Sequence, residues 1–203
     1  MSESKSTEER RREIINAARH LFFTKGYEAT STTDIMKAVG IAKGTLYYHF
    51  SSKEEILDTL LEDIADHMVQ RAMMVKENSD YSVVERMIGV IMAANIACYD
   101  DGDIIETLHL PQNAIFHQKS YALTIKKLSP IMLEIVMEGI EQGIFRTDYP
   151  ESAVHMAMSY SVTAFEDDNI QNINLIYGFV YNLERLLGAE KGSLKGFLKL
   201  FQM

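Results

Sequence analysis

The residues whose types could do chemistry gather in one short segment, residues 43–53, which reads KGTLYYHFSSK. The segment holds two adjacent tyrosines, a histidine and two lysines, and no acidic residue. At about 100° per residue, a helix over 43–50 would place Leu46 and Phe50 on one side and Tyr47 and Tyr48 on the other. Tyrosine hydroxyls donate to phosphate oxygens, and the rings contact sugars and thymine methyl groups. Contact with duplex DNA is the chemistry predicted here; packing of the tyrosines against neighbouring helices or a protein partner is the open alternative.

Two further helices are predicted before this segment. Ser6 and Ser31 each stand three residues before an acidic residue, which is the pattern of a capping box. Apolar residues follow each serine at helical spacing, and Gly26 and Gly40 stand where left-handed C-caps are expected. Two short helices joined through Gly40 and packed on a longer first helix predict a helix-turn-helix unit.

The remainder of the chain also favours helices. Ser52 begins a capping pattern before a long helix with an apolar stripe. Further helices are predicted at about 81–99, 103–110, 113–142, 151–166, 172–188 and 191–201. Pro130 falls inside one of them and predicts a kink or an interruption. The predicted class is all-α, with a helix-turn-helix domain over residues 1–53 and a second helical domain over residues 54–203.

Charge is distributed unevenly along the chain. Residues 1–53 carry nine Lys/Arg against six Asp/Glu, a net charge of +3, whereas the other residues carry a net charge of −12. Only the N-terminal segment is therefore suited to a polyanion, although a solvated basic helix would give the same count. The sequence shows no apolar run long enough for a transmembrane helix and no signal peptide, and its single cysteine excludes an internal disulfide. We expect a cytoplasmic protein.

The motif around residue 40 is specific. The run GIAKGTLYYHF at 40–50, with TTDI at 32–35 before it and SKEEIL at 52–57 after it, resembles the DNA-binding segment of the TetR family of transcriptional regulators. The first predicted helix, with IINAA at 14–18 and LF at 21–22, resembles that family too. The resemblance covers about 50 of the 203 residues, and beyond about residue 60 only the number and length of the helices agree.

The resemblance implies the following DNA contacts: Thr32, Lys43, Gly44, Thr45, Tyr47, Tyr48, His49 and Lys53. In the family pattern Thr32 also caps the second helix, the two lysines bind phosphate, and the tyrosines and histidine grip the backbone and the base edges. Positions 44 and 45 face bases or backbone. Ala42 departs from the pattern, because a serine or threonine is common there, so no hydroxyl contact is expected at that position.

The resemblance also implies a homodimer that pairs through helices about 151–166 and 172–188 across a two-fold axis. The first helix carries small residues that we expect at that interface: Ala153, Ala157, Ser161 and Ala164. The second carries an apolar stripe that we also expect there: Ile176, Phe179, Val180, Leu183 and Leu187. Burial of both stripes within one subunit is the alternative reading. A dimer would place two recognition helices about 34 Å apart, as a palindrome requires.

An effector pocket is expected between about residues 60 and 165. This region holds nine of the twelve methionines, whose flexible side chains suit an apolar or aromatic small molecule, although methionines also fill ordinary cores. The candidate lining residues are Met92, Cys98, Tyr99, Glu106, His109, Phe116, His117, Tyr121, His155, Tyr160 and Phe165. The spacing of histidines and cysteine fits no metal site, and no cofactor is expected.

Together these features predict a ligand-responsive transcriptional regulator. It would act as a repressor, bind a palindromic operator in double-stranded DNA as a dimer, and be released by a small-molecule effector. The alternative is a helical adaptor whose tyrosine-rich helix binds a protein partner. An enzyme is not expected, because no nucleophile elbow, phosphate-binding glycine loop or paired-carboxylate motif stands out.

Overall fold

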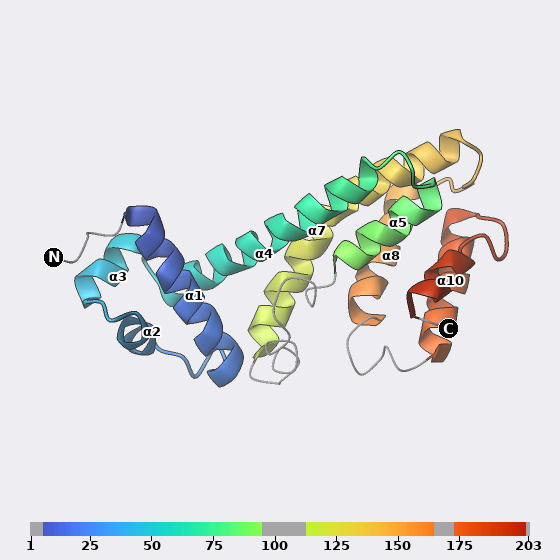
Figure 1. The fold of residues 1–203 in the computed structure, drawn as a ribbon. Coiled ribbons are helices and arrows are strands. Elements are labelled where there is room, and N and C mark those ends of the chain that lie inside the picture. Colours follow the sequence, from blue (N-terminus) through green and yellow to red (C-terminus); the bar gives the residue numbers. More distant parts are fainter. Residues whose placement is uncertain (1–5, 95–112, 165–172, 202–203) are drawn as a thin grey trace. The chain divides into compact units, whose positions relative to one another are not determined.

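The structure, a computed structural model, describes residues 6–94, 113–164 and 173–201 (Figure 1). Its elements are helices, and no strand occurs within these ranges, which confirms the predicted all-α class. The helix predicted at about 103–110 lies outside the described residues. The chain divides into two compact units, one made of residues 1–65 and 100–123 and the other of residues 66–99 and 124–203. The predicted domain boundary after residue 53 stays a prediction.

Three helices and the start of a fourth form the first unit (Figure 1). They are α1 (Thr7–Lys25), α2 (Thr32–Val39), α3 (Lys43–His49) and α4 (Lys53–Lys76). Both predicted capping boxes are present, since the Ser6 and Ser31 side chains accept from backbone N–H groups three residues on. Gly40 has the left-handed conformation that was predicted. Gly26 does not, because its φ of 90° is combined with a ψ of 150°.

The core of the first unit forms where the helices face one another. The residues buried there are Ile14, Ala18, Phe22, Ile35, Leu46, Phe50, Ile56, Leu57 and Leu60. The first turns of α7 (Ala114–Glu141) also belong to this unit. There the Phe116 ring meets the Phe23 ring edge-on with centroids 4.9 Å apart, and the Lys119 ammonium pairs with the carboxylates of Glu54 and Asp58.

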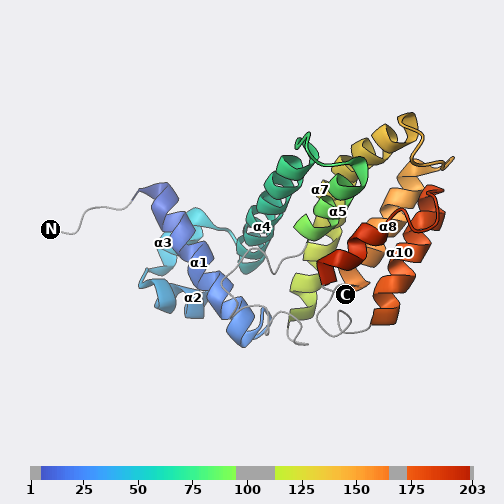
Figure 2. The same ribbon diagram turned by 45° about the vertical axis from the view of Figure 1, so that its right-hand side comes forward.

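The second unit contains α5 (Val83–Ala93), α8 (Pro150–Ala164), α10 (Ile173–Leu187) and the 3₁₀ helix η3 (Lys195–Phe201), together with the later parts of α4 and α7. Helices α8 and α10 lie side by side (Figure 2). The α7 helix continues through Pro130, so the predicted interruption does not occur. No helix in the described ranges is long and apolar enough to cross a membrane.

The C-terminal segment differs from the α-helix predicted at 191–201, because residues 195–201 form a 3₁₀ helix. A buried carboxylate binds the turn that precedes this helix. Glu184, only 5% exposed, accepts hydrogen bonds from the backbone N–H groups of Gly192 and Leu194 at 2.8 and 3.1 Å. These bonds fix a turn between α10 and η3, in which Gly192 has a φ of 88° that a right-handed helix does not accommodate.

Gly188 ends α10 at a point of close backbone approach. Its φ is +59°, and a Cβ there would lie 2.1 Å from the carbonyl oxygen of Arg146. The Arg146 N–H donates to the carbonyl of Leu187 at 2.8 Å, so the two backbones are joined at this point. Any larger side chain would therefore displace a hydrogen-bonded backbone.

We predict that Gly188→Ala lowers the free energy of unfolding by about 2–4 kcal/mol, because left-handed strain adds to a clash with backbone. Gly143→Ala is the matched control: its φ is +73°, but a Cβ there would meet no described atom within 4 Å. It should lose only about 1 kcal/mol. Urea unfolding measures both losses, and equal losses would contradict the close approach.

Candidate DNA-binding surface

Helix α3 is held by its apolar side. It has only seven residues, and its N-cap, Ala42, offers no side-chain hydrogen bond. Leu46 and Phe50 are each 1% exposed, so the predicted inward face is confirmed. Because the helix lacks a cap and is short, burial of these two side chains is what fixes its position on the rest of the unit.

The other side of α3 is open. The Tyr47 side chain is 45% exposed and the Tyr48 side chain 77% exposed, so neither ring is sealed inside the subunit. Lys43 and Gly44 are exposed, and the Lys43 ammonium lies 5.7 Å from the centroid of the Tyr47 ring. The arc therefore presents two aromatic hydroxyls and a cation, without a carboxylate between residues 43 and 50.

The remaining predicted contacts are less open. Thr45 and His49 are half-buried, and the His49 ring meets the Tyr48 ring edge-on at 5.1 Å. The prediction that Thr32 caps α2 is wrong, because the N-cap is Ser31. The Ser31 backbone is extended, and its Oγ accepts from the Asp34 N–H at 3.1 Å. Thr32 is the first residue of the helix and is half-buried. Its DNA contact stays a prediction.

The Asp34 carboxylate binds Lys25 and Ser31 at the start of α2. Its Oδ2 accepts from the Lys25 ammonium at 2.8 Å and from the Ser31 N–H and hydroxyl at 2.9 and 2.7 Å. The Lys25 hydrogen bond, followed by the two from Ser31, holds the pKa of the Asp34 carboxyl far below its usual range. The carboxylate therefore stays ionised, and Lys25 is paired inside the unit.

Lys53 has a structural role that the sequence did not indicate. Its ammonium donates to the carbonyl oxygens of Tyr27 and Thr30 at 2.7 and 2.9 Å, and lies 4.1 Å from the centroid of the Tyr27 ring. These contacts tie the α1–α2 loop to the first residue of α4. An ammonium has three N–H donors, so at most one is left for the phosphate contact that was predicted.

Arg11 is a residue of this surface region that sequence reasoning missed. Its guanidinium donates to the carbonyl of His49, the last residue of α3, at 2.7 Å. The only sequence signal was the arginine run at 10–12, which is equally typical of a solvated helix face. Its partner is 38 residues away, so spacing along the chain could not reveal the contact.

The structure describes six of the eleven predicted effector residues, and their role in a pocket stays a prediction. Phe116, His117 and Tyr121 belong to the first unit, where Phe116 is buried against Phe23. Met92 is half-buried in the second unit. His155 and Tyr160 are exposed on α8 in the second unit. The other candidates lie outside the described residues: Cys98, Tyr99, Glu106, His109 and Phe165.

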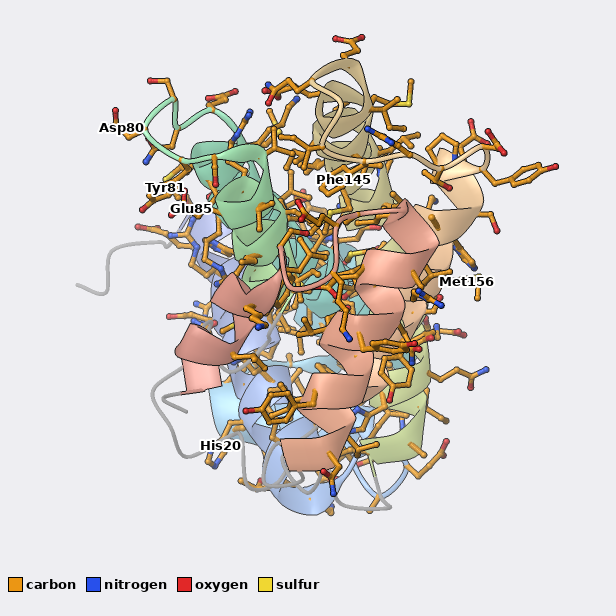
Figure 3. The ribbon with its side chains drawn as sticks, turned by 90° about the vertical axis from the view of Figure 1, so that its right-hand side faces the viewer. His20, Asp80, Tyr81, Glu85, Phe145 and Met156 are labelled. Atoms are coloured by element: carbon orange, nitrogen blue, oxygen red, sulfur yellow. The ribbon has the colours of Figure 1, made fainter. Side chains whose placement is uncertain are left out.

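The stripes predicted for the dimer interface are buried within the subunit instead. They are Ala153, Ala157 and Ser161 on α8, and Ile176, Phe179, Val180, Leu183 and Leu187 on α10, all 5% exposed or less. The side chain of Ala164 is not described. Small residues let α8 approach its neighbours closely, which accounts for their inward position. The outer faces instead carry large side chains that are 41–53% exposed: Met156 and Tyr160 on α8, and Tyr177 and Tyr181 on α10. Figure 3 shows the Met156 side chain on the outside of α8.

Comparison with known proteins identifies the family. Residues 14–60 match the family described as "Bacterial regulatory proteins, tetR family", and residues 98–173 match "Tetracyclin repressor-like, C-terminal domain". The chain belongs to the TetR family. The TetR family consists of transcriptional regulators, so the prediction of a regulator and not an enzyme is confirmed. The 14–60 match contains α2, α3 and the first turns of α4.

Curated relatives and solved structures agree with this assignment. The HTH-type transcriptional repressor KstR2 of Mycolicibacterium smegmatis is 28% identical over 155 residues, which cover 72% of each chain. The biofilm operon regulator IcaR of Staphylococcus aureus is 41% identical over 70 residues, 34% of this chain and 38% of that protein. Two solved structures share the fold. A gamma-butyrolactone receptor (ArpA-like protein) is 19% identical with a TM-score of 0.63, covering 97% of both chains. RolR in complex with resorcinol is 18% identical with a TM-score of 0.64, covering 96% of this chain and 93% of that one.

We predict that Lys53→Met lowers the stability of this TetR-family protein by about 1–2 kcal/mol, because two carbonyls lose a charged donor. Lys43→Met, which removes the same charge from an exposed site, should change stability by less than about 0.5 kcal/mol. Thermal unfolding of the two variants provides the comparison. If Lys53→Met were as stable as wild type, the contacts of Lys53 with the α1–α2 loop would not contribute to stability.

Proposed function

We propose that this TetR-family protein is a ligand-responsive repressor that binds a palindromic operator as a homodimer and leaves it when a small molecule binds. The observation that carries the proposal is the division of α3 into a buried side and an open side. Leu46 and Phe50 fix the helix, while Tyr47 and Tyr48 remain available to a partner. A helix held from one side with its other side free is what insertion into a major groove requires.

Charge favours DNA as that partner. Residues 1–53 carry a net charge of +3 in a chain whose net charge is −9. Tyr47, Tyr48 and Lys43 would contact phosphates and base edges from the open arc, and Gly44 would let the backbone come close, since a Cβ there would meet no described atom within 4 Å. Thr45 and His49 are half-buried and would contact DNA only at their exposed edges.

The outer faces of α8 and α10 support a homodimer. Met156 and Tyr160 are four residues apart on α8, and Tyr177 and Tyr181 are four apart on α10, so each pair lies on one side of its helix. The two helices are packed together, and the Tyr160 ring stacks on the Phe179 ring with centroids 5.7 Å apart. Exposed methionine and tyrosine side chains are of the kind that isologous interfaces bury.

An apolar or aromatic small molecule is the effector that we propose. RolR, which shares the fold, is known in complex with resorcinol, a small aromatic compound. A ligand can release the dimer from DNA only if it binds the released conformation more tightly than the bound one. A protein-binding adaptor is not favoured, because the relatives that match most of the chain are named transcriptional repressors.

Selection of duplexes from a random-sequence library by the wild-type protein tests the proposal. We expect a palindrome with half-sites about one helical turn apart, and affinity that falls steeply with salt. Tyr48→Ala should weaken binding to the selected duplex about tenfold or more while the far-UV helical signal is unchanged, because the ring is 77% exposed. Tyr149→Ala is the matched control, since Tyr149 is 76% exposed in the second unit.

Two results would contradict this prediction. Equal affinity for selected and random duplexes would reject operator recognition. Loss of the helical signal in Tyr48→Ala would show that the ring supports the fold.

The dimer surface is tested separately. Tyr177→Glu with Tyr181→Glu should shift the protein from dimer to monomer in sedimentation, because two carboxylates would be buried without partners. Tyr149→Glu, which places the same charge on another exposed tyrosine of the second unit, should leave the dimer intact. A double variant that stays dimeric would exclude this face.

A further inference from the structure

Arg11 joins three helices of the first unit through one guanidinium. From α1 it donates to the carbonyl oxygen of His49 at the end of α3, with an Nη1–O distance of 2.7 Å. Its other terminal nitrogen donates to the hydroxyl of Thr59 in α4 at 3.3 Å. The guanidinium carbon lies 4.1 Å from the centroid of the Phe50 ring, so the group also covers a buried aromatic side chain.

Each of these contacts uses a group that is suited to a cation. The last carbonyls of a helix have no partner within the helix, and the negative end of the helix dipole favours a positive charge there. The Thr59 hydroxyl donates its own proton to the carbonyl of Glu55 at 2.8 Å, so its lone pair is free to accept from Arg11. A planar guanidinium holds its terminal nitrogens in a rigid fork and can lie flat on a ring, whereas an ammonium is a point charge without that fixed geometry.

These contacts lie at the end of α3, next to the two tyrosines that we propose contact DNA. Helix α3 has no capping side chain at its start, so its C-terminal end is where a polar contact fixes it. His49 and Phe50 directly follow Tyr47 and Tyr48, and a rotation of this end would change the direction in which the two tyrosines face. Arg11 is a basic residue of the DNA-binding unit, but its guanidinium is already engaged by the protein itself.

We propose that Arg11 is a positioning residue for DNA recognition. It holds the C-terminal end of α3 to α1 and α4, and so sets the direction of the tyrosines without contacting phosphate. This inference rests on the proposed function of α3, and it makes one prediction that needs no DNA and one that does.

The first test follows amide hydrogen exchange in the unbound protein. The Phe50 N–H donates to the Leu46 carbonyl at the end of α3, and the Gly40 N–H donates to the Met36 carbonyl at the end of α2. Arg11→Lys should speed exchange of the Phe50 amide about tenfold relative to that of Gly40, because the end of α3 opens locally. If both amides speed up equally or neither changes, Arg11 contributes only global stability or nothing, and the proposal fails.

The second test compares binding to the duplex that the wild-type protein selects with binding to a random duplex of the same length. A positioning residue affects mainly the specific complex. Arg11→Lys and Arg11→Gln should each reduce the ratio of specific to non-specific affinity about tenfold, with the salt dependence unchanged. A phosphate contact would behave differently: Arg11→Gln would lower the salt slope by about one, with equal loss on both duplexes, and Arg11→Lys would bind almost normally.

Two control variants complete the experiment. Arg12→Gln makes the same charge change on the next residue, which is exposed, and should preserve the affinity ratio. Ile15→Val lowers stability from a buried position of α1 that is only 8% exposed, and should also preserve it. If Ile15→Val reduced the ratio as Arg11→Lys does, loss of stability would account for the effect and the proposal would be wrong. If the wild-type protein selected no duplex, the proposed function would fail, whereas the exchange measurement would still decide whether Arg11 positions α3.

Discussion

The first unit depends on one physical constraint, which is that α3 is too short to be a stable helix without contacts to the other helices. Isolated helices shorter than about 12–15 residues are marginal in water, and α3 has seven residues and an alanine at its N-cap. Contacts with the rest of the unit must therefore fix it, and all of these lie on one side, where Leu46 and Phe50 are buried and Arg11 binds the last carbonyl. On the opposite side Tyr47 and Tyr48 are exposed, so these side chains are available to a partner.

Several of the basic side chains of the unit are bound by the protein itself and are not fully available to DNA. Arg11 and Lys53 donate to backbone carbonyls, and Lys25 is paired with Asp34. These cations stabilise a small domain in which loops and a short helix leave carbonyls without partners. The net charge of +3 therefore overstates what is available to phosphates, and Lys43, which is exposed beside Tyr47, is the better candidate for a phosphate contact.

Local features could be predicted from the sequence, and long-range ones could not. The capping boxes at Ser6 and Ser31 and the inward side of α3 were predicted correctly, because each is determined within four residues. The partners of Arg11 and Lys53 lie 23–48 residues away, and nothing in the spacing indicates them. On α8 and α10 both faces are partly apolar, so periodicity located the stripes but not which one is buried in the subunit.

Exposed tyrosines lie on both of the surfaces that we propose for binding, and charge distinguishes these two surfaces. An exposed tyrosine has an apolar ring and a polar tip, so it tolerates water before a partner arrives and gains contact area afterwards. Tyr48 on α3 and Tyr181 on α10 are alike in this respect. The segment around Tyr48 has no carboxylate between residues 43 and 50, whereas residues 54–203 carry a net charge of −12 that repels a polyanion. Charge therefore supports our proposal that the tyrosines of α3 contact DNA and those of α10 contact a second subunit.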